Sequence, residues 1–175
     1  MNELDRVNDL YRLNELCADL GVTISDGQML AWANACDPVA VPDVVFDVIS
    51  NIGLLSDGGP PAVPSRRRQR ISLPADADAL WELLWEVDEP TAIGVLADLA
   101  ASARSSRPRR SLRSQGRPED VFAEIGRLTG PGSRWWTNTD LTNWNPVTQH
   151  TFDAVVVCAG NGLAVTIVAF EGEGG

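Results

Sequence analysis

Residues 151–170, TFDAVVVCAGNGLAVTIVAF, carry the strongest fold signal in the chain. Two runs rich in β-branched residues flank Gly160, Asn161 and Gly162. Asn-Gly accommodates the positive φ that both central residues of a type I′ turn require, and this turn joins antiparallel strands. The stretch therefore predicts a β-hairpin. Because two isolated strands are at best marginally stable, other parts of the chain must cover it.

An unusual aromatic tract, WWTNTDLTNWNP, lies before the hairpin at residues 135–146 and holds three of the six tryptophans and three asparagines. Residues 134–137 favour a further strand. Tryptophan offers a large rigid surface and asparagine both a donor and an acceptor, which suits a binding epitope for protein or sugar. The alternative is that Trp135 and Trp144 fill the core while the asparagines form turns. Since neighbouring side chains on a strand point to opposite faces, we expect Trp135 or Trp136 to face outward or into an interface.

Upstream, residues 1–130 read as about five helices. Residues 4–20 carry apolar side chains mostly at steps of three and four positions, which is typical of a helix with one buried face. Residues 25–28, SDGQ, have the capping-box form S-x-x-Q and predict a helix to about residue 36. Residues 42–52 also favour a helix, although their valines and isoleucines are compatible with a buried strand.

Further helices are expected in the second half of this segment. Asp76 or Asp78 is a suitable N-cap for a helix whose apolar face falls within residues 80–85. A break at Pro90 precedes a helix that continues to about residue 103. Pro-Glu-Asp at residues 118–120 is a strong helix start, because proline fits the first turn and acidic side chains complement the helix dipole.

Charge is segregated along the chain. There are 24 acidic residues and 14 arginines but no lysine, giving a formal net charge of −10. Segment 56–70 is a Gly/Pro-rich linker that ends in RRRQR, and residues 104–117 contribute six arginines without apolar periodicity. We expect 104–117 to be a mobile loop that either grips phosphate or an acidic protein surface, or folds back on the acidic helices. Its candidate contact residues are Arg109, Arg110 and Arg113.

The architecture that follows is a single α+β domain over residues 1–175. A helical N-terminal two-thirds, residues 1–130, packs on a small antiparallel β-sheet formed by the C-terminal segment, residues 131–175. The sheet is built around the hairpin, and the helices cover it because its apolar face must be buried.

The composition argues against several functional classes. A strongly acidic chain is poorly suited to neutralise nucleic-acid phosphates, and a chain without lysine lacks a Walker phosphate loop. Three cysteines without CxxC spacing and one histidine do not favour a zinc site or a disulfide framework, so we expect no metal and no cofactor. The charged N-terminus and the absence of an apolar run of about 20 residues predict a cytoplasmic protein without membrane contact. Arginine without lysine is typical of a GC-rich genome.

Catalysis would have to use His150, the only histidine, together with the nearby Asp153. No G-x-S-x-G elbow or reactive-cysteine motif supplies a nucleophile for such a pair. We therefore expect His150 to be a structural residue at a loop–strand junction. A small-ligand enzyme that uses His150 and Asp153 remains an alternative.

The sequence leads us to expect a non-enzymatic protein-binding inhibitor of the immunity-protein or antitoxin kind. It would neutralise a toxin or enzyme partner by occluding the active site, and electrostatic steering would bring the two together. A secretion or assembly chaperone, presenting an apolar groove, is another alternative. The expected contact residues are Trp135, Trp136, Asn138, Asp140, Asn143, Trp144, Arg109, Arg110 and Arg113.

Overall fold

A computed structural model describes residues 2–23, 29–52, 72–105, 117–148 and 153–170. Its helices and strands alternate along the chain rather than falling into two blocks. In chain order they are α1 (Glu3–Thr23), β1 (Met29–Ala35), the 3-10 helix η1 (Pro38–Ala40), α2 (Val41–Asn51), α3 (Ala77–Trp81), β2 (Trp85–Val87), α4 (Glu89–Ser105), α5 (Pro118–Thr129), β3 (Arg134–Thr137), β4 (Asp153–Gly160) and β5 (Leu163–Phe170).

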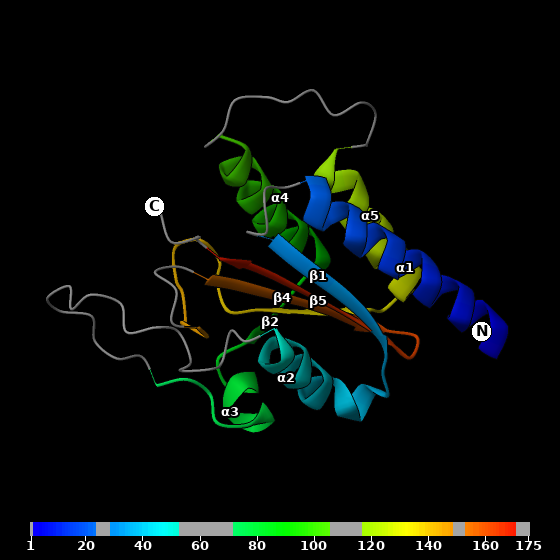
Figure 1. Cartoon of the computed structure of the whole chain (residues 1–175), viewed down its shortest axis with the longest axis horizontal. Helices are drawn as coiled ribbons and strands as arrows, with labels where there is room; N and C mark the ends of the chain where they lie inside the picture. The colour runs from blue at the N-terminus through cyan, green and yellow to red at the C-terminus, as the bar shows by residue number, and fades with distance from the viewer. Residues whose placement is uncertain (1, 24–28, 53–71, 106–116, 149–152, 171–175) are drawn as a thin grey trace, which may run out of the picture.

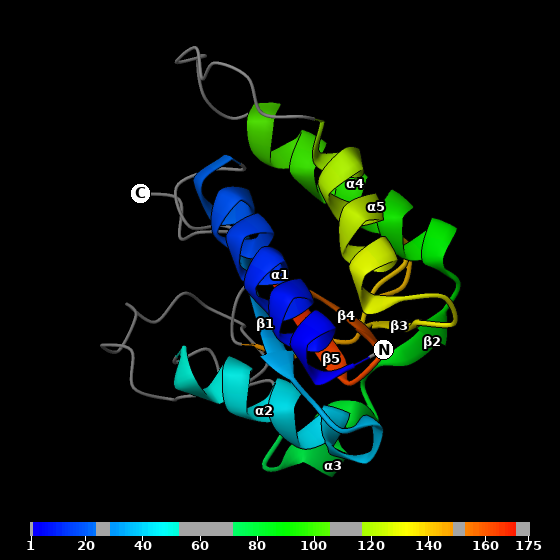
Figure 2. The same ribbon diagram turned by 90° about the vertical axis from the view of Figure 1, so that its right-hand side faces the viewer.

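The strands form one five-stranded sheet in the order β1-β5-β4-β3-β2, and every neighbouring pair is antiparallel. Helices α1, α4 and α5 lie on one face of the sheet and α2 and α3 on the other (Figures 1 and 2). The α+β fold is thus confirmed, with the C-terminal hairpin at the centre of the sheet. Among the described residues, no helix combines the length and apolar character that crossing a membrane requires.

Two hydrophobic cores result, one on each face of the sheet. On β4, Ala154, Val156 and Cys158 contribute to the core under α1, α4 and α5, whereas Val155 and Val157 contribute to the core under α2 and α3. This alternation follows from the two-residue period of a strand. The nearly continuous apolar sequence of β4 and β5 is therefore explained by the burial of both faces.

The central hairpin has the predicted turn. Gly160 pairs with Leu163, so the loop consists of Asn161 and Gly162 alone. Their φ angles are 52° and 74°, the positive values that a type I′ turn needs.

A second turn packs against this hairpin. A Cβ built on Gly160 would overlap the carbonyl oxygen of Thr129 and would lie 3.1 Å from Ser133 Cα. The same construction at Gly130, whose φ is 90°, would overlap the side chain of Asn161. Glycine at these two positions allows the end of α5 and the hairpin turn to pack closely.

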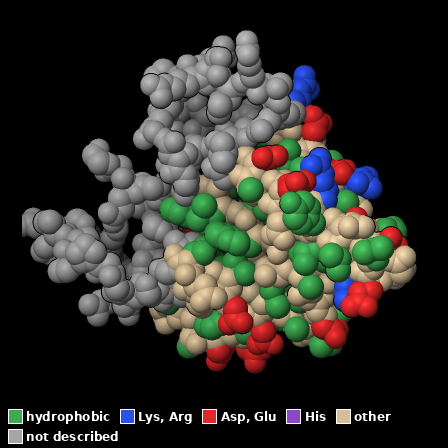
Figure 3. All heavy atoms as spheres, turned by 45° about the vertical axis from the view of Figure 1, so that its right-hand side comes forward, with side chains coloured by type: hydrophobic (Ala, Val, Ile, Leu, Met, Phe, Trp, Pro, Cys, Tyr) green, Lys and Arg blue, Asp and Glu red, His purple; other side chains and the backbone are tan. Residues whose placement is uncertain are grey.

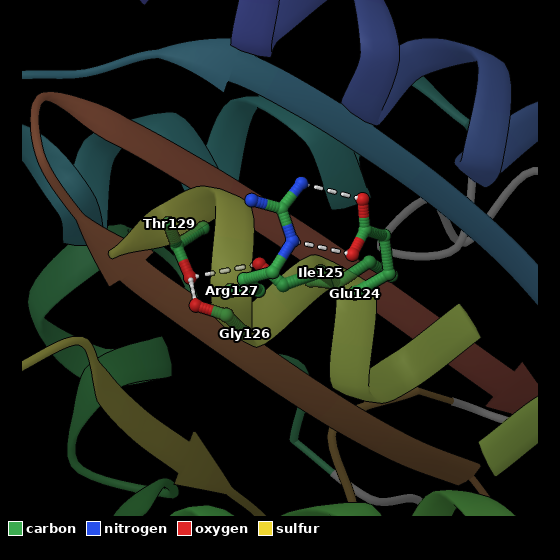
Figure 4. Close-up of polar contacts among 5 residues, drawn as sticks. All are labelled: Glu124, Ile125, Gly126, Arg127 and Thr129. Carbon is green, nitrogen blue, oxygen red and sulfur yellow. Dashed lines mark hydrogen bonds and ion pairs between the residues drawn. The ribbon is translucent and has the colours of Figure 1, made fainter. Parts of the chain in front are cut away.

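Helix α5 begins as its sequence predicts, with Pro118 in the first turn, and Gly130 follows its last residue. Figure 4 shows the two contacts that support its C-terminal half. Arg127 donates to both carboxylate oxygens of Glu124 at 2.6 and 2.7 Å. The hydroxyl of Thr129 donates to the carbonyls of Ile125 and Gly126, at 2.9 and 3.0 Å. Both contacts lie near the end of the helix, where backbone carbonyls lack helical partners.

The predicted helix to about residue 36 is wrong. Residues 29–35 form β1, an edge strand that pairs with β5 along its full length; residues 25–28 lie outside the described part. The helix-like start signal was overridden by pairing, because β1 places Met29 and Ala33 in the core and completes the sheet. The predicted helical face over residues 80–85 is also shorter than expected, since α3 ends at Trp81 and Trp85 begins β2.

Two further predictions are confirmed, and two others concern residues outside the described part of the chain. Residues 42–52 are helical, because α2 spans Val41–Asn51 and buries one face. Asp76 caps α3, its carboxylate accepting the Ala79 amide at 2.8 Å. The linker 56–70 lies outside the described residues, as does 106–116, which is most of the arginine-rich loop.

Candidate functional site

A pocket of about 330 Å³ opens at the end of the sheet where the central hairpin turns. It lies between η1, the start of α2, the end of α3, strand β3 and the hairpin. The lining residues are Cys36, Pro38, Val39, Val41, Pro42, Trp81, Gly132, Arg134, Trp136, Ala159, Gly160, Gly162 and Leu163. Most of them are apolar or glycine, so the wall offers carbon surface and bare backbone.

Short connections hold these elements in place. The backbone N–H of Cys36 donates to the Gly162 carbonyl at 2.9 Å, which ties the end of β1 to the hairpin turn. The chain then enters η1, where Val39 is 86% exposed although it lines the pocket. Val39 therefore forms an exposed apolar rim of the pocket.

The pocket contains an aromatic pair. The ring centroids of Trp81 and Trp136 are 5.0 Å apart with the planes inclined by 54°, a favourable tilted arrangement. The Arg134 guanidinium lies 5.0 Å from the Trp136 centroid, in cation–π contact. Arg134 also donates two hydrogen bonds to the Glu86 carboxylate, at 2.9 and 2.5 Å. This pairing lowers the pKa of Glu86 and raises the pKa of Arg134, so both groups stay charged near neutral pH.

The pocket lies in an acidic layer. Described residues of the α2/α3 layer, η1 and β2 included, carry seven acidic side chains and no arginine: Asp37, Asp43, Asp47, Asp76, Asp78, Glu82 and Glu86. Arg134 of β3 is the one cation among the pocket-lining residues. Helices α1, α4 and α5 contain ten acidic residues, but these are accompanied by Arg6, Arg12, Arg104 and Arg127. In the space-filling view, the lower part of the face, at the level of α2 and α3 in Figure 1, carries acidic groups, whereas the upper part carries acidic and basic groups together (Figure 3).

The thiol of Cys36 is not set up as a nucleophile. The side chain is buried, and its thiol donates to the Asp37 carbonyl at 3.2 Å. Burial raises the pKa of Cys36, and the nearby charges of Asp37 and Asp43 raise it further. A thiolate is therefore disfavoured, since reactive cysteines require a lowered pKa. Across the described part of the chain, no group of three or more His, Cys, Asp or Glu side chains is placed to hold a metal ion.

The two adjacent tryptophans of the aromatic tract are both buried. Trp135 is 1% exposed in the core beneath α1, α4 and α5, and Trp136 is 9% exposed in the core of the α2/α3 layer. They do point to opposite faces of β3, but helices cover both faces. The expectation that one of them faces outward is therefore wrong, whereas its alternative, a position at an interface, is not tested by the burial of either side chain within this chain. Of the pair, only Trp136 reaches the pocket.

The rest of the tract is organised around the buried carboxylate of Asp153. Asn138 Nδ2, the backbone N–H of Val147 and the backbone N–H of Thr148 donate to it at 2.7, 3.1 and 2.6 Å. The Thr148 hydroxyl and the Trp144 indole N–H donate at 2.8 and 3.3 Å. The carboxylate is fully occupied as an acceptor and fastens residues 138–148 to the start of β4. Asn138 is itself buried, so neither group is placed to contact a partner.

Outside this network, Asp140 and Asn143 are exposed at a tight turn. Asp140 accepts from the Thr142 and Asn143 backbone N–H groups at 2.8 and 2.6 Å. Hydrogen bonds from these two residues hold the pKa of Asp140 well below its usual range. Leu141 at the tip has a φ of 72°, a left-handed conformation that the turn imposes.

Four residues singled out from the sequence lie outside the described part: Arg109, Arg110, Arg113 and His150. Trp144 is half-buried with its indole N–H directed at Asp153.

Sequence reasoning did not identify the pocket. Its key residues, Val39, Trp81 and Arg134, come from three separate segments that only the fold brings together. One signal was available. Pro38 and Pro42 bracket a short apolar segment next to two aspartates, which is typical of a fixed, exposed connection.

Searches against protein-family models, curated proteins and solved structures found no match to the chain.

Proposed function

We propose that this protein is a non-catalytic binding protein that neutralises a protein partner, of the immunity-protein or antitoxin kind. The observation that carries the proposal is the open apolar pocket with Trp81, Trp136 and Arg134 in its wall, set in an acidic layer. Tryptophan and arginine are the residues most enriched among those that dominate binding energies at protein interfaces. The acidic surroundings favour rapid association with a basic partner.

Cys36 and Asp153 are the described groups considered for catalysis, and the hydrogen bonds that both make within the protein support a binding role over a catalytic one. Cys36 is held as a neutral thiol, and the Asp153 carboxylate is occupied by five donor groups. A general base needs a free lone pair within reach of a substrate proton. Because Asp153 is buried and fully bonded, it is poorly placed for the acid–base role that the His150–Asp153 alternative requires.

The test uses two substitutions of the same kind on opposite layers. Val39→Asp places a charge on the apolar rim of the pocket, whereas Tyr11→Asp places one on α1, at a side chain that is 70% exposed. Neither should alter folding, since both side chains project into solvent, and circular dichroism would confirm this. Each protein is immobilised and used to capture partners from a native lysate of the producing organism, with quantification by mass spectrometry.

We expect one stoichiometric partner to be captured by the wild type and by Tyr11→Asp, and to be lost by at least tenfold from Val39→Asp. The captured partner should have an enzymatic or toxic activity that the wild type suppresses. Recovery of no stoichiometric partner, or of one whose activity is unchanged by the protein, would contradict the proposal.

A further inference from the structure

We infer that the pocket binds a basic segment of a protein partner that inserts one aromatic or branched aliphatic side chain between Val39, Trp81 and Trp136. The inference deepens the proposed function and rests on it in one respect, that this pocket faces the partner. It adds the chemistry that the partner must present, which is an apolar anchor flanked by cations.

The apolar anchor follows from what the pocket wall offers. A volume of about 330 Å³ lies at the lower end of the range of ligand sites, about 300–1,000 Å³, which suits one large side chain better than an extended molecule. Among the lining side chains, the polar groups of Cys36 and Arg134 are already hydrogen-bonded, to the Asp37 carbonyl and to the Glu86 carboxylate. A polar anchor would therefore find few complementary groups, and burying it unpaired would weaken binding.

Arg134 does not change this conclusion. It is the charged member of the wall, but both of its hydrogen bonds to Glu86 are in place and its face is against Trp136. Its positive charge is offset at the site by the Glu86 carboxylate. The guanidinium therefore acts mainly as part of the flat wall beside the tryptophans.

The carboxylates around the opening are the reason for expecting cations on the partner segment, beside its apolar side chain. Asp37 and Asp43 lie close enough to Cys36, in the wall, for their charges to raise its pKa. Glu82 follows Trp81 directly in sequence and is exposed. No salt bridge to an arginine is formed by any of these three acids within the described residues. Because acidic groups outnumber arginines among the described residues around the opening, we expect a negative potential there, which attracts arginine or lysine and disfavours acidic segments.

The probe for the test is a phage-displayed library of random 12-residue peptides, selected on the folded wild-type protein with Val39→Asp as the counter-selection. Selected peptides are synthesised, and their affinities are measured by fluorescence anisotropy at 50 and 250 mM NaCl. The rim variant is Asp37→Asn/Asp43→Asn/Glu82→Gln. The matched control removes three acidic charges from the other layer: Glu3→Gln/Asp98→Asn/Glu119→Gln, all at exposed positions.

We expect the selected peptides to combine two or more arginines or lysines with an aromatic or branched aliphatic residue. Replacing that apolar residue by alanine should weaken binding at least tenfold. Val39→Asp should do the same, because the cost of burying a carboxylate against the apolar residue exceeds its attraction to the flanking cations. The rim variant should weaken binding about five- to tenfold at 50 mM NaCl, and less at 250 mM because salt screens exposed charges. The matched control should bind as the wild type does.

Selection of neutral or acidic peptides, or equal binding by the rim variant and the wild type, would overturn the inference. These results are distinguishable from failure of the proposed function. A captured partner that binds through a neutral segment would leave the proposed function standing and refute the basic segment. Basic peptides that bind this pocket, while no partner is neutralised, would support the inference and refute the inhibitor role.

Discussion

At the scale of single residues, the buried carboxylate of Asp153 determines how residues 138–148 are held. Six hydrogen bonds, from four residues, converge on its two oxygens. Buried charge is costly unless hydrogen bonds replace water, and here backbone and side-chain donors do so. Among the described residues no arginine lies in an ion pair with it. The aromatic tract, which from the sequence resembles a binding epitope, thus consists largely of residues that surround the buried Asp153 carboxylate.

Asp153→Asn tests this role. The substituted amide would direct its N–H₂ group at surrounding donors, so we expect the free energy of unfolding to fall by about 2 kcal/mol or more. Asp140→Asn, at an exposed carboxylate in the same segment, is the control and should cost less. Urea titration measures both variants, and amide exchange at Val147 and Thr148 should quicken in Asp153→Asn. Equal stabilities of the two variants would contradict the anchoring role.

Two buried thiols predict how stability depends on pH. Burial raises the pKa of Cys17 and of Cys158 to about 12, compared with 9.0 for the free group. Between these values the unfolded chain releases protons that the native protein keeps. Stability is therefore unaffected by the two thiols below pH 9 and falls as pH rises above it, by up to about 1.4 kcal/mol per pH unit for each thiol.

Urea titrations between pH 8 and 11 measure this loss. The double variant Cys17→Ala/Cys158→Ala should show a shallower decline than the wild type, whatever its stability at pH 8. Parallel declines would show that these thiols are not protected by burial.

At the scale of elements, close packing between the end of α5 and the hairpin turn depends on glycine. Gly160→Ala would overlap the Thr129 carbonyl, which belongs to the backbone and has little freedom to move. We expect a loss of about 1–3 kcal/mol in the free energy of unfolding. Gly94→Ala is the matched control, because that glycine lies inside α4 with open space around it, and there alanine should stabilise by about 0.5–1 kcal/mol. Thermal melts that shift in the same direction for both would contradict this packing.

The short helix α3 sets the position of Trp81 and depends on its cap. Asp76→Ala removes the acceptor of the Ala79 amide hydrogen bond and should cost about 0.5–2 kcal/mol. Asp78→Ala, in the first turn of the same helix, lacks a capping bond and should cost less. Urea titration compares the two. A larger loss for Asp78→Ala would show that the cap does not stabilise this helix.

Elements with strong local signals could be predicted from the sequence. The hairpin was predictable because Asn161 and Gly162 select one turn type, and α5 because Pro118 and Gly130 mark its ends. Strand β1 was not, because its position depends on pairing with β5, 128 to 140 residues later, and a capping-box pattern precedes it. The unbroken apolar runs of β4 and β5 did contain a sign that both sheet faces are covered. That sign would have placed Trp135 and Trp136 inside.

At the scale of the whole molecule, the pocket lies in the α2/α3 layer, whose described charged residues are mainly acidic. The described residues carry 20 acidic side chains and six arginines, and the arginines lie mostly away from the α2/α3 layer. A pocket on that layer therefore combines a largely apolar wall with surroundings in which acidic side chains outnumber arginines among the described residues. Its residues lie far apart in sequence, at 36–42, 81, 132–136 and 159–163, so only the folded chain reveals it.

The most direct test of this account is an inhibition titration of the captured partner. The partner's activity is measured at a fixed concentration well above the dissociation constant while the protein is added in steps. We predict that activity falls in proportion to added wild type or Tyr11→Asp and is lost at one molar equivalent, whereas Val39→Asp needs at least ten times more. Inhibition by Val39→Asp at the same stoichiometry as the wild type, or no inhibition by the wild type at any excess, would contradict the account.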